Sequence, residues 1–227
     1  MKKTLRSAFI ATIPVLTGYI VLGFGFGLVL KSVGFGILVA FAMSFLIYAG
    51  SMQYVAVGLL TGGASIITTA LTTLMVNARH IFYGISMLDK YKGRDKCTPY
   101  LIFALTDETY SLVCNDNPEI KEEDRTGYYF WVTILNHSYW VIGSVLGAVA
   151  GTIITFNTKG VDFALTALFI TVFVDQWLNS KRHTPAIIGL LASIGCLTIF
   201  GKDGFLIPTM LIIALVLSLI KEGKENG

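Results

Sequence analysis

Apolar residues fall in long runs along this chain, separated by short polar segments. Several runs approach 20 residues, the length that a helix needs to cross a hydrocarbon core of about 30 Å. Transmembrane strands would alternate apolar and polar residues over about ten positions, and these runs do not alternate. The eight runs are Ala8–Leu30, Phe35–Leu60, Ala64–Leu88, Cys97–Cys114, Tyr128–Phe156, Phe163–Asn179, Pro185–Phe200 and Phe205–Ile220. The pattern predicts an all-α, polytopic integral membrane protein with seven or eight hydrophobic helices.

The number of crossings stays open because the last two runs are short. They are joined by the tight segment "GKDG", so they form either two short spans or a re-entrant hairpin. Lys and Arg residues divide almost evenly between the two sides of an eight-span arrangement. Since only a clear excess of these residues marks the cytoplasmic side, the sequence does not fix the orientation.

Composition supports a single membrane domain over residues 1–227, located in the cell membrane. Charged residues make up 14% of the chain, against about 25% in soluble domains. The formal net charge of +3 is too small to indicate a nucleic-acid partner. The basic N-terminus leads into an apolar run without a clear cleavage site, which favours an uncleaved first span over a signal peptide.

Two segments 120 positions apart suggest an internal repeat. "YIVLGFGFG" and "YWVIGSVLG" place Tyr, Val and two Gly residues at the same spacing, and "MQY" is followed by "DQW" 123 positions later. We therefore predict repeat halves at 1–126 and 127–220, a common construction among secondary transporters. The glycines recur every fourth residue, which favours close packing of helices over contact with a ligand.

Asp107 and Glu108 are the strongest candidates for chemistry, since both lie near the middle of an apolar run. A charged side chain in the membrane interior is costly and is a functional candidate by default. One of the two acids could exchange a proton during transport, and the alternative is a structural ion pair with Arg79. Neighbouring helical positions point about 100° apart, so we expect one acid to face the pathway. Tyr110 shares the Asp107 face.

The segment "LMVNARHIFYG" places three polar residues inside another apolar run. Arg79 could pair with an acid of the next run, clamp a substrate carboxylate with its planar fork, or reach toward the interface. His80 could exchange a proton near neutral pH, although a hydrogen bond to a neighbouring helix is the more ordinary role. Asn77 shares the His80 face. We expect this segment to face "TDETY" across a polar interior.

Weaker candidates lie in three other runs. Ser51 and Gln53 follow a glycine in "AGSMQY", a composition that suits either a helix break or ordinary packing. Asn136, His137 and Trp140 lie about one-third of the way along their run, where tryptophan is often an interfacial anchor. Asp175 lies near the end of its run and could simply reach water.

Taken in series, four motifs resemble the AzlC family, the large subunit of branched-chain amino acid exporters. They are "YAGSMQYVAVGLL", "TTLMVNARHIFYGISM", "LTDETYSL" and "FVDQWL". The resemblance covers the first six runs. It implies a small membrane partner, AzlD, and export of valine, leucine, isoleucine and sometimes methionine or analogues. The family-typical positions in this chain are Ser51, Gln53, Asn77, Arg79, His80, Asp107, Glu108, Asp175 and Gln176.

The leading hypothesis is a proton-coupled secondary transporter that exports branched-chain amino acids with a small hydrophobic subunit. In this hypothesis Arg79 or a helix N-terminus takes the substrate carboxylate, and Asp107 or Glu108 takes the ammonium group. Tyr110 or Trp140 would contact the substrate side chain. The alternative is a channel or sensor-type subunit without active transport. No HExxH motif, no recognisable Ser/His motif and no P-loop occur, so we expect neither an enzyme nor a cofactor or metal site.

Overall fold

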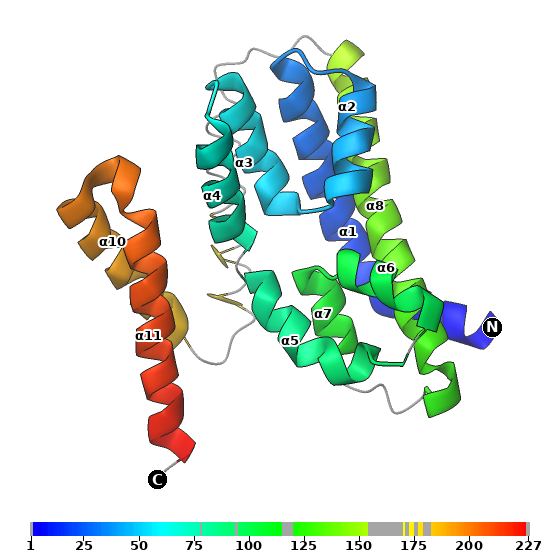
Figure 1. The fold of residues 1–227 in the computed structure, drawn as a ribbon. Helices are drawn as coiled ribbons and strands as arrows, with labels where there is room; N and C mark the ends of the chain where they lie inside the picture. The colour runs from blue at the N-terminus through cyan, green and yellow to red at the C-terminus, as the bar shows by residue number, and fades with distance from the viewer. Residues whose placement is uncertain are drawn as a thin grey trace. The chain divides into compact units, whose positions relative to one another are not determined.

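The protein is helical throughout the part that the structure describes. The computed structural model describes residues 2–77, 79–93, 95–114, 120–153, 170, 173–174, 177–178 and 183–225. Every regular element in these ranges is a helix (Figure 1), as predicted. Three stretches of the described chain are long and apolar enough to cross a membrane: Thr4–Ser32, Glu122–Ile153 and Thr184–Gly201. The total of seven or eight helices stays a prediction.

The centre of the first compact unit, Met1–Leu165, is a pair of long helices. Helix α1 (Lys2–Ser32) packs along α8 (Arg125–Ile153) in the same direction (Figure 1). A Cβ atom on Gly23 would lie 2.9 Å from the Trp140 carbonyl oxygen, and one on Gly143 would lie 2.9 Å from the Ile20 carbonyl oxygen. The packing role predicted for these glycines is therefore confirmed.

The α1–α8 interface also bears on the predicted repeat. Gly23 and Gly143 occupy equivalent places in the two matched segments, and each lies against the backbone of the other helix. Gly27 and Gly147 do the same one turn further along. This reciprocal contact is what two parallel copies of one segment would make around a two-fold axis. The repeat and its boundaries remain a prediction.

The second apolar run is a helical hairpin and not one crossing helix. Helix α2 (Ile37–Ala42) continues into a π-helical turn, η1 (Met43–Ile47), and the chain reverses before α3 (Gly50–Thr61) (Figure 1). Tyr48, between the two arms, has a left-handed backbone with φ 45°. Each arm is about 16–18 Å long at 1.5 Å per residue, roughly half of a hydrocarbon core.

The fourth run is also divided, which corrects the prediction of one helix over Cys97–Cys114. We call residues 37–61 the first hairpin and residues 98–113 the second hairpin. A short 3₁₀ turn, η2 (Asp95–Cys97), leads into α6 (Thr98–Phe103), and α7 (Asp107–Val113) follows after a turn. Thr106 begins α7 as its N-cap, because its Oγ1 accepts a hydrogen bond from the Thr109 backbone N–H. Asp107 and Glu108 therefore occupy the first turn of a helix, where negative charge is favoured, and not the middle.

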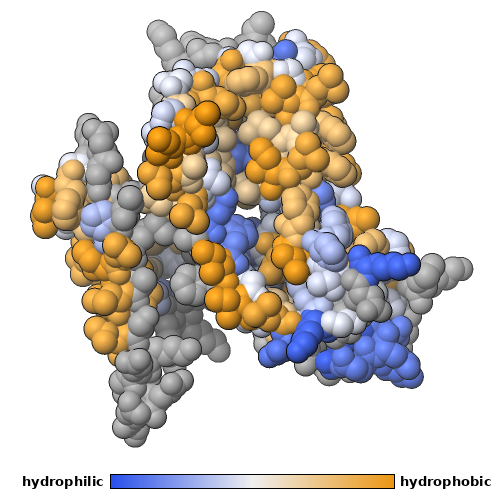
Figure 2. All heavy atoms as spheres, in the orientation of Figure 1, coloured by the Kyte–Doolittle hydropathy of each residue, from blue (hydrophilic) through white to orange (hydrophobic). Residues whose placement is uncertain are grey.

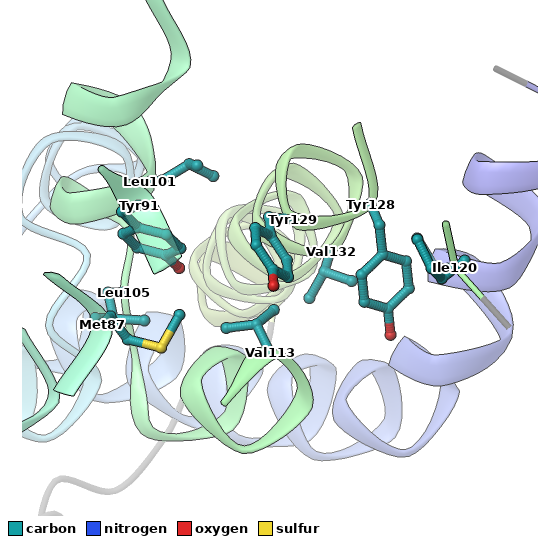
Figure 3. Packing of buried hydrophobic residues seen from close by; sticks show 10 residues of the cluster. Met87, Tyr91, Leu101, Leu105, Val113, Ile120, Tyr128, Tyr129 and Val132 are labelled. Atoms are coloured by element: carbon teal, nitrogen blue, oxygen red, sulfur yellow. The ribbon is translucent and has the colours of Figure 1, made fainter. Parts of the chain in front are cut away.

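The third run gives α4 (Ile66–Asn77) and α5 (Arg79–Tyr91), on either side of Ala78, which lies outside the described residues. Beyond α7, a second 3₁₀ turn, η3 (Glu122–Asp124), leads into α8. A buried apolar cluster from α5, α6, α7 and α8 holds the second hairpin in place (Figure 3). Its labelled members are Met87, Tyr91, Leu101, Leu105, Val113, Ile120, Tyr128, Tyr129 and Val132.

The outside of the first unit is largely apolar, as a lipid-facing surface requires. Ile66 is 89% exposed and Leu38 is 82% exposed. Figure 2 shows hydrophilic side chains at the centre of one face, between α4 and α5, with apolar side chains around them. Asn77 ends α4 and His80 lies in the first turn of α5, so both belong to the helix ends that border this region.

The second compact unit, Thr166–Gly227, contains the last two described helices. Helix α10 (Thr184–Gly204) packs against α11 (Leu206–Glu225). Gly201, inside the "GKDG" segment, has φ 71°, a value that glycine adopts without steric cost. The predicted tight turn between the last two runs is confirmed. Most of the sixth predicted run, including Asp175 and Gln176, lies outside the described residues.

Candidate functional site at the meeting of two helical hairpins

A carboxylate and a tyrosine from distant parts of the chain meet beside the turn of the second hairpin. The Tyr19 hydroxyl, on α1, donates a hydrogen bond of 2.6 Å to Glu108 Oε2. The same hydroxyl lies 2.7 Å from Thr106 Oγ1. Tyr19 and Thr106 are buried and Glu108 is half-buried. A hydrogen bond to an ionised carboxylate is among the stronger ones in proteins, so this contact fixes the α6–α7 turn against α1.

The contact continues as a chain of polar groups into α8. Thr106 Oγ1 lies 3.1 Å from Thr109 Oγ1, which accepts a hydrogen bond of 3.0 Å from the Asn136 amide Nδ2. Thr109 and Asn136 are fully buried. Four side chains and one carboxylate thus connect α1, the second hairpin and α8 without interruption.

This chain of polar groups, from Tyr19 to Asn136, lies halfway along both long helices. Tyr19 is next to the midpoint of the span Thr4–Ser32, and Asn136 is close to the midpoint of Glu122–Ile153. The sequence pattern places Asn136 and His137 about a third of the way along, because the predicted run Tyr128–Phe156 begins six residues after this span and ends three residues beyond it. A carboxylate at this depth cannot reach water along its own side chain, so Glu108 depends on partners or on a wet cavity.

A second set of polar contacts holds the first hairpin. The Trp140 indole Nε1 donates a hydrogen bond of 2.9 Å to Gln53 Oε1, and Gln53 Nε2 donates one of 3.2 Å to Ser44 Oγ. Gln53 and Ser44 are fully buried. A Cβ atom on Gly50 would lie 3.2 Å from the Trp140 ring, so only glycine leaves this approach unhindered. Trp140 therefore positions the start of α3 and is not an interfacial anchor.

Tyr48 lies where the two hairpins meet. Its ring centre is 4.3 Å from that of His137, and its side chain faces Tyr19, Thr106 and Glu108. Its buried hydroxyl has no hydrogen-bond partner. A left-handed backbone in a residue other than glycine costs about 1–3 kcal/mol, and such residues cluster at functional sites. The strained, buried Tyr48 therefore makes this turn a candidate functional element.

Further polar atoms on α8 also lack partners. They are Asn136 Oδ1, Thr133 Oγ1 and His137 Nε2, each buried. A buried polar atom without a partner costs about 1–3 kcal/mol, and such atoms need an explanation. A polar ligand or ordered water bound between the hairpins would satisfy them.

His137 links α8 to both hairpins. Its Nδ1 lies 3.0 Å from the Tyr100 hydroxyl of α6, and its ring stacks on Phe45 of η1 at 5.3 Å. The outer side of this contact is a mainly apolar groove of about 540 Å³ that Phe41, Phe45, Tyr100, Phe130, Ile134 and His137 help to line. His137 thus separates the groove from Tyr48, and its contacts are those of a residue that joins helices.

The segment predicted to face "TDETY" contacts it through Tyr83, while the polar interior between the two stays a prediction. Tyr83 of α5 stacks on Tyr110 of α7 with ring centres 4.8 Å apart, and the Ser86 and Tyr110 hydroxyls are 3.0 Å apart. His80 Nδ1 lies 3.2 Å from the Asn77 carbonyl oxygen. The Arg79 side chain lies outside the described part of the structure, so its pairing with an acid stays a prediction.

The structure brings together only some of the candidate residues. Gln53, Glu108, Asn136 and Trp140 belong to the two sets of contacts, while Ser51 and Asp107 occupy the first turns of α3 and α7. Sequence reasoning missed Tyr19, Tyr48, Thr106 and Thr109. One signal was present: a threonine followed by two acids is typical of a helix start. Applied to "TDE", this rule predicts the break before α7.

Comparison with known proteins shows the family to which the chain belongs. The sequence profile of the AzlC protein family matches residues 14–154. The chain is 45% identical over 222 residues to "Branched-chain amino acid transport protein AzlC" of Bacillus subtilis, covering 98% of this chain and 87% of that protein. The chain belongs to the AzlC family. The resemblance predicted from the four motifs is confirmed.

Two more distant relatives are also membrane proteins. An "Uncharacterized membrane protein" of Haemophilus influenzae is 41% identical over 94% of this chain and 88% of its own length. "Inner membrane protein YgaZ" of Escherichia coli is 28% identical over 90% of this chain and 84% of its own length. No solved structure matches the chain. Together with the long apolar helices, these relatives establish this AzlC-family chain as a multi-pass membrane protein.

Proposed function

We propose that this AzlC-family protein exports branched-chain amino acids by proton-coupled secondary transport, together with a small AzlD-like membrane subunit. The substrate class follows from the name of the Bacillus subtilis relative, which aligns with 98% of this chain. The single structural observation that carries the mechanism is the Glu108 carboxylate, held by Tyr19 halfway along the long helices. Buried ionisable groups at such depth mark substrate and proton pathways.

The groups around Glu108 suit the ammonium end of an amino acid. The carboxylate supplies charge, and the unpartnered Asn136 Oδ1 and Tyr48 hydroxyl supply further acceptors. The substrate carboxylate would bind at Arg79 or at the N-terminus of α3, which has no side-chain cap. Broken helices whose ends point at the substrate are a common feature of secondary transporters. The site as a whole would therefore accommodate a zwitterion.

Coupling follows if a proton and the ammonium group compete for Glu108. A proton that enters from the outside would displace the substrate, and a substrate from the inside would displace the proton. Only one of the two, the proton or the ammonium group, occupies the carboxylate at a time. The inward movement of a proton therefore permits the outward movement of a substrate. Such competition produces antiport, the direction that export against a gradient requires.

Transport by purified protein tests this proposal. The protein, co-expressed with its small subunit, is reconstituted into liposomes, with the membrane potential clamped and radiolabelled valine added outside. We expect valine to accumulate above its external concentration when the lumen is acidic, and leucine and isoleucine to compete with it. Lysine and glutamate, whose side chains carry charge, should compete poorly.

The alternatives give different results. A channel would let valine equilibrate without accumulation at any pH difference. Accumulation with an alkaline lumen would indicate symport and would contradict competition at Glu108. Absence of valine movement under all conditions, with correctly folded protein, would contradict the proposed function itself.

A further inference from the structure

We propose that Tyr19 transmits the protonation state of Glu108 to the α1–α8 helix pair, so that Tyr19 is the positioning residue of proton coupling. This inference rests on the proposed function. The Tyr19 hydroxyl contacts both Glu108 Oε2 at 2.6 Å and Thr106 Oγ1 at 2.7 Å. It belongs to α1, whereas both partners belong to the second hairpin. The hydroxyl is therefore the junction between a titratable group and the long helices.

The hydroxyl and carboxyl protons available at this junction explain why it responds to protonation of Glu108. A carboxylate only accepts hydrogen bonds, so Tyr19 donates its single proton to Glu108. The Thr106 hydroxyl proton is directed to Thr109 Oγ1, so the contact between Tyr19 and Thr106 then has no proton to share. A carboxylic acid is itself a donor. When Glu108 is protonated, it can donate to Tyr19, which then turns its proton toward Thr106. One proton on Glu108 thus reverses the Tyr19–Glu108 hydrogen bond and completes the hydrogen bond from Tyr19 to Thr106.

The change at Thr106 bears on the helix start and on α8. Thr106 Oγ1 caps α7 by accepting from the Thr109 N–H at 3.3 Å, and it donates to Thr109 Oγ1 at 3.1 Å. A proton received from Tyr19 fills the acceptor capacity of Thr106 and so holds its own proton on Thr109. The far end is fixed, because the Asn136 amide can only donate to Thr109 through Nδ2.

The other described groups near Glu108 do not make the connection to a long helix that Tyr19 makes. Tyr48, from the first hairpin, lies nearby and faces Tyr19 and Thr106, but no hydrogen bond joins its hydroxyl to Glu108. Asp107 is the neighbouring residue of the same turn and points about 100° away around α7. Among the described contacts of Glu108, the Tyr19 hydroxyl is the hydrogen bond that leads directly to a long helix.

The test compares Tyr19→Phe with Tyr139→Phe. Tyr139 is the equivalent tyrosine of the second matched segment, is also buried, and lies 3.2 Å from the Thr12 hydroxyl. Tyr139→Phe therefore removes a hydroxyl of the same kind from the same helix pair without touching Glu108. Reconstituted proteins are assayed for valine accumulation driven by an acidic lumen, and for valine exchange at equal pH on both sides.

We expect Tyr19→Phe to lower gradient-driven accumulation by about tenfold or more, the effect of losing one hydrogen bond to a charged group. Exchange at equal pH should fall several-fold less than gradient-driven accumulation, since it needs no net proton movement. Tyr139→Phe should retain both activities. Glu108→Gln combined with Tyr19→Phe should behave as Glu108→Gln alone, because Tyr19 acts through Glu108.

A measurement that does not depend on transport complements the assay. In infrared spectra recorded across pH, the carboxyl band of Glu108 is identified by its loss in Glu108→Gln. In Tyr19→Phe this band should move in frequency, because the carboxyl group has lost its hydrogen bond to the Tyr19 hydroxyl. In Tyr139→Phe the band should keep the parent frequency.

Each outcome separates the inference from the proposed function. If the parent transports valine with the pH gradient and Tyr19→Phe retains that dependence and the parent infrared profile, the role of Tyr19 is wrong and the function stands. If the parent transports valine without regard to pH, proton coupling and the Tyr19 role both fail. If the parent moves no valine but the infrared shift occurs, the proposed function fails and the Tyr19–Glu108 link stands.

Discussion

Glu108→Gln abolishes gradient-driven valine accumulation, whereas Asp107→Asn retains most of it. Glutamine keeps the size of the side chain and accepts the Tyr19 hydrogen bond, but it can neither carry a proton nor neutralise an ammonium group. Losing one partner of a buried charge pair costs about 3–5 kcal/mol. We therefore expect accumulation to fall by two orders of magnitude or more, measured as initial valine uptake into liposomes with an acidic lumen.

Asp107→Asn is the matched control, because Asp107 is an acid in the same helical turn and is also half-buried. It also decides which acid faces the pathway, a choice that the sequence left open. Parental transport by both variants, each present at normal levels in the membrane, would remove the carboxylates from the mechanism. A loss confined to Asp107→Asn would assign the role to the other acid.

Gly27→Ala strongly reduces the amount of folded protein. A Cβ atom at this position would overlap the Ser144 carbonyl oxygen and the Ala148 backbone nitrogen, and backbone cannot rotate away as a side chain can. The two long helices would have to separate along their length. Overpacking of this kind costs about 3 kcal/mol and occasionally more. The measurement is thermal unfolding in detergent, together with the fraction of monodisperse protein after size-exclusion chromatography.

Gly18→Ala provides the control on the same helix. A Cβ atom on Gly18 would meet nothing within 4 Å, and alanine favours a helix over glycine by about 1 kcal/mol. This variant should be as stable as the parent or slightly more so. Equal unfolding temperatures for Gly27→Ala and the parent would show that α1 and α8 do not approach as closely as the glycine contacts require.

The sequence predicted the elements whose structure depends on length and on one helical face. Helices α1 and α8 follow from apolar runs of sufficient length, and their contact follows from glycines at every fourth position. The second hairpin was not predicted, since two half-length apolar helices have the same hydropathy as one full helix. For the first hairpin, a helix break at "AGSMQY" was one of two alternatives, and the left-handed position itself, Tyr48, carries neither glycine nor proline to decide between them.

The candidate site was also predictable only in part. Depth in an apolar run was enough to single out Glu108, Asn136 and Gln53, because burying a polar group requires a reason. Their partners were not predictable from spacing. Tyr19 is 89 positions from Glu108, and Trp140 is 87 positions from Gln53. Such pairs are determined by how the hairpins pack on α1 and α8, which a single sequence does not specify.

The most direct test of competition at Glu108 is the number of protons that valine binding releases. Calorimetric titration of the purified complex with valine, repeated in buffers of different ionisation enthalpy, measures this number. Because a ligand that displaces a bound proton must release it, release should approach about one proton per valine as the pH is lowered. Glu108→Gln should lose this release. Valine binding without proton release by the parent, or unchanged release in Glu108→Gln, would contradict the account.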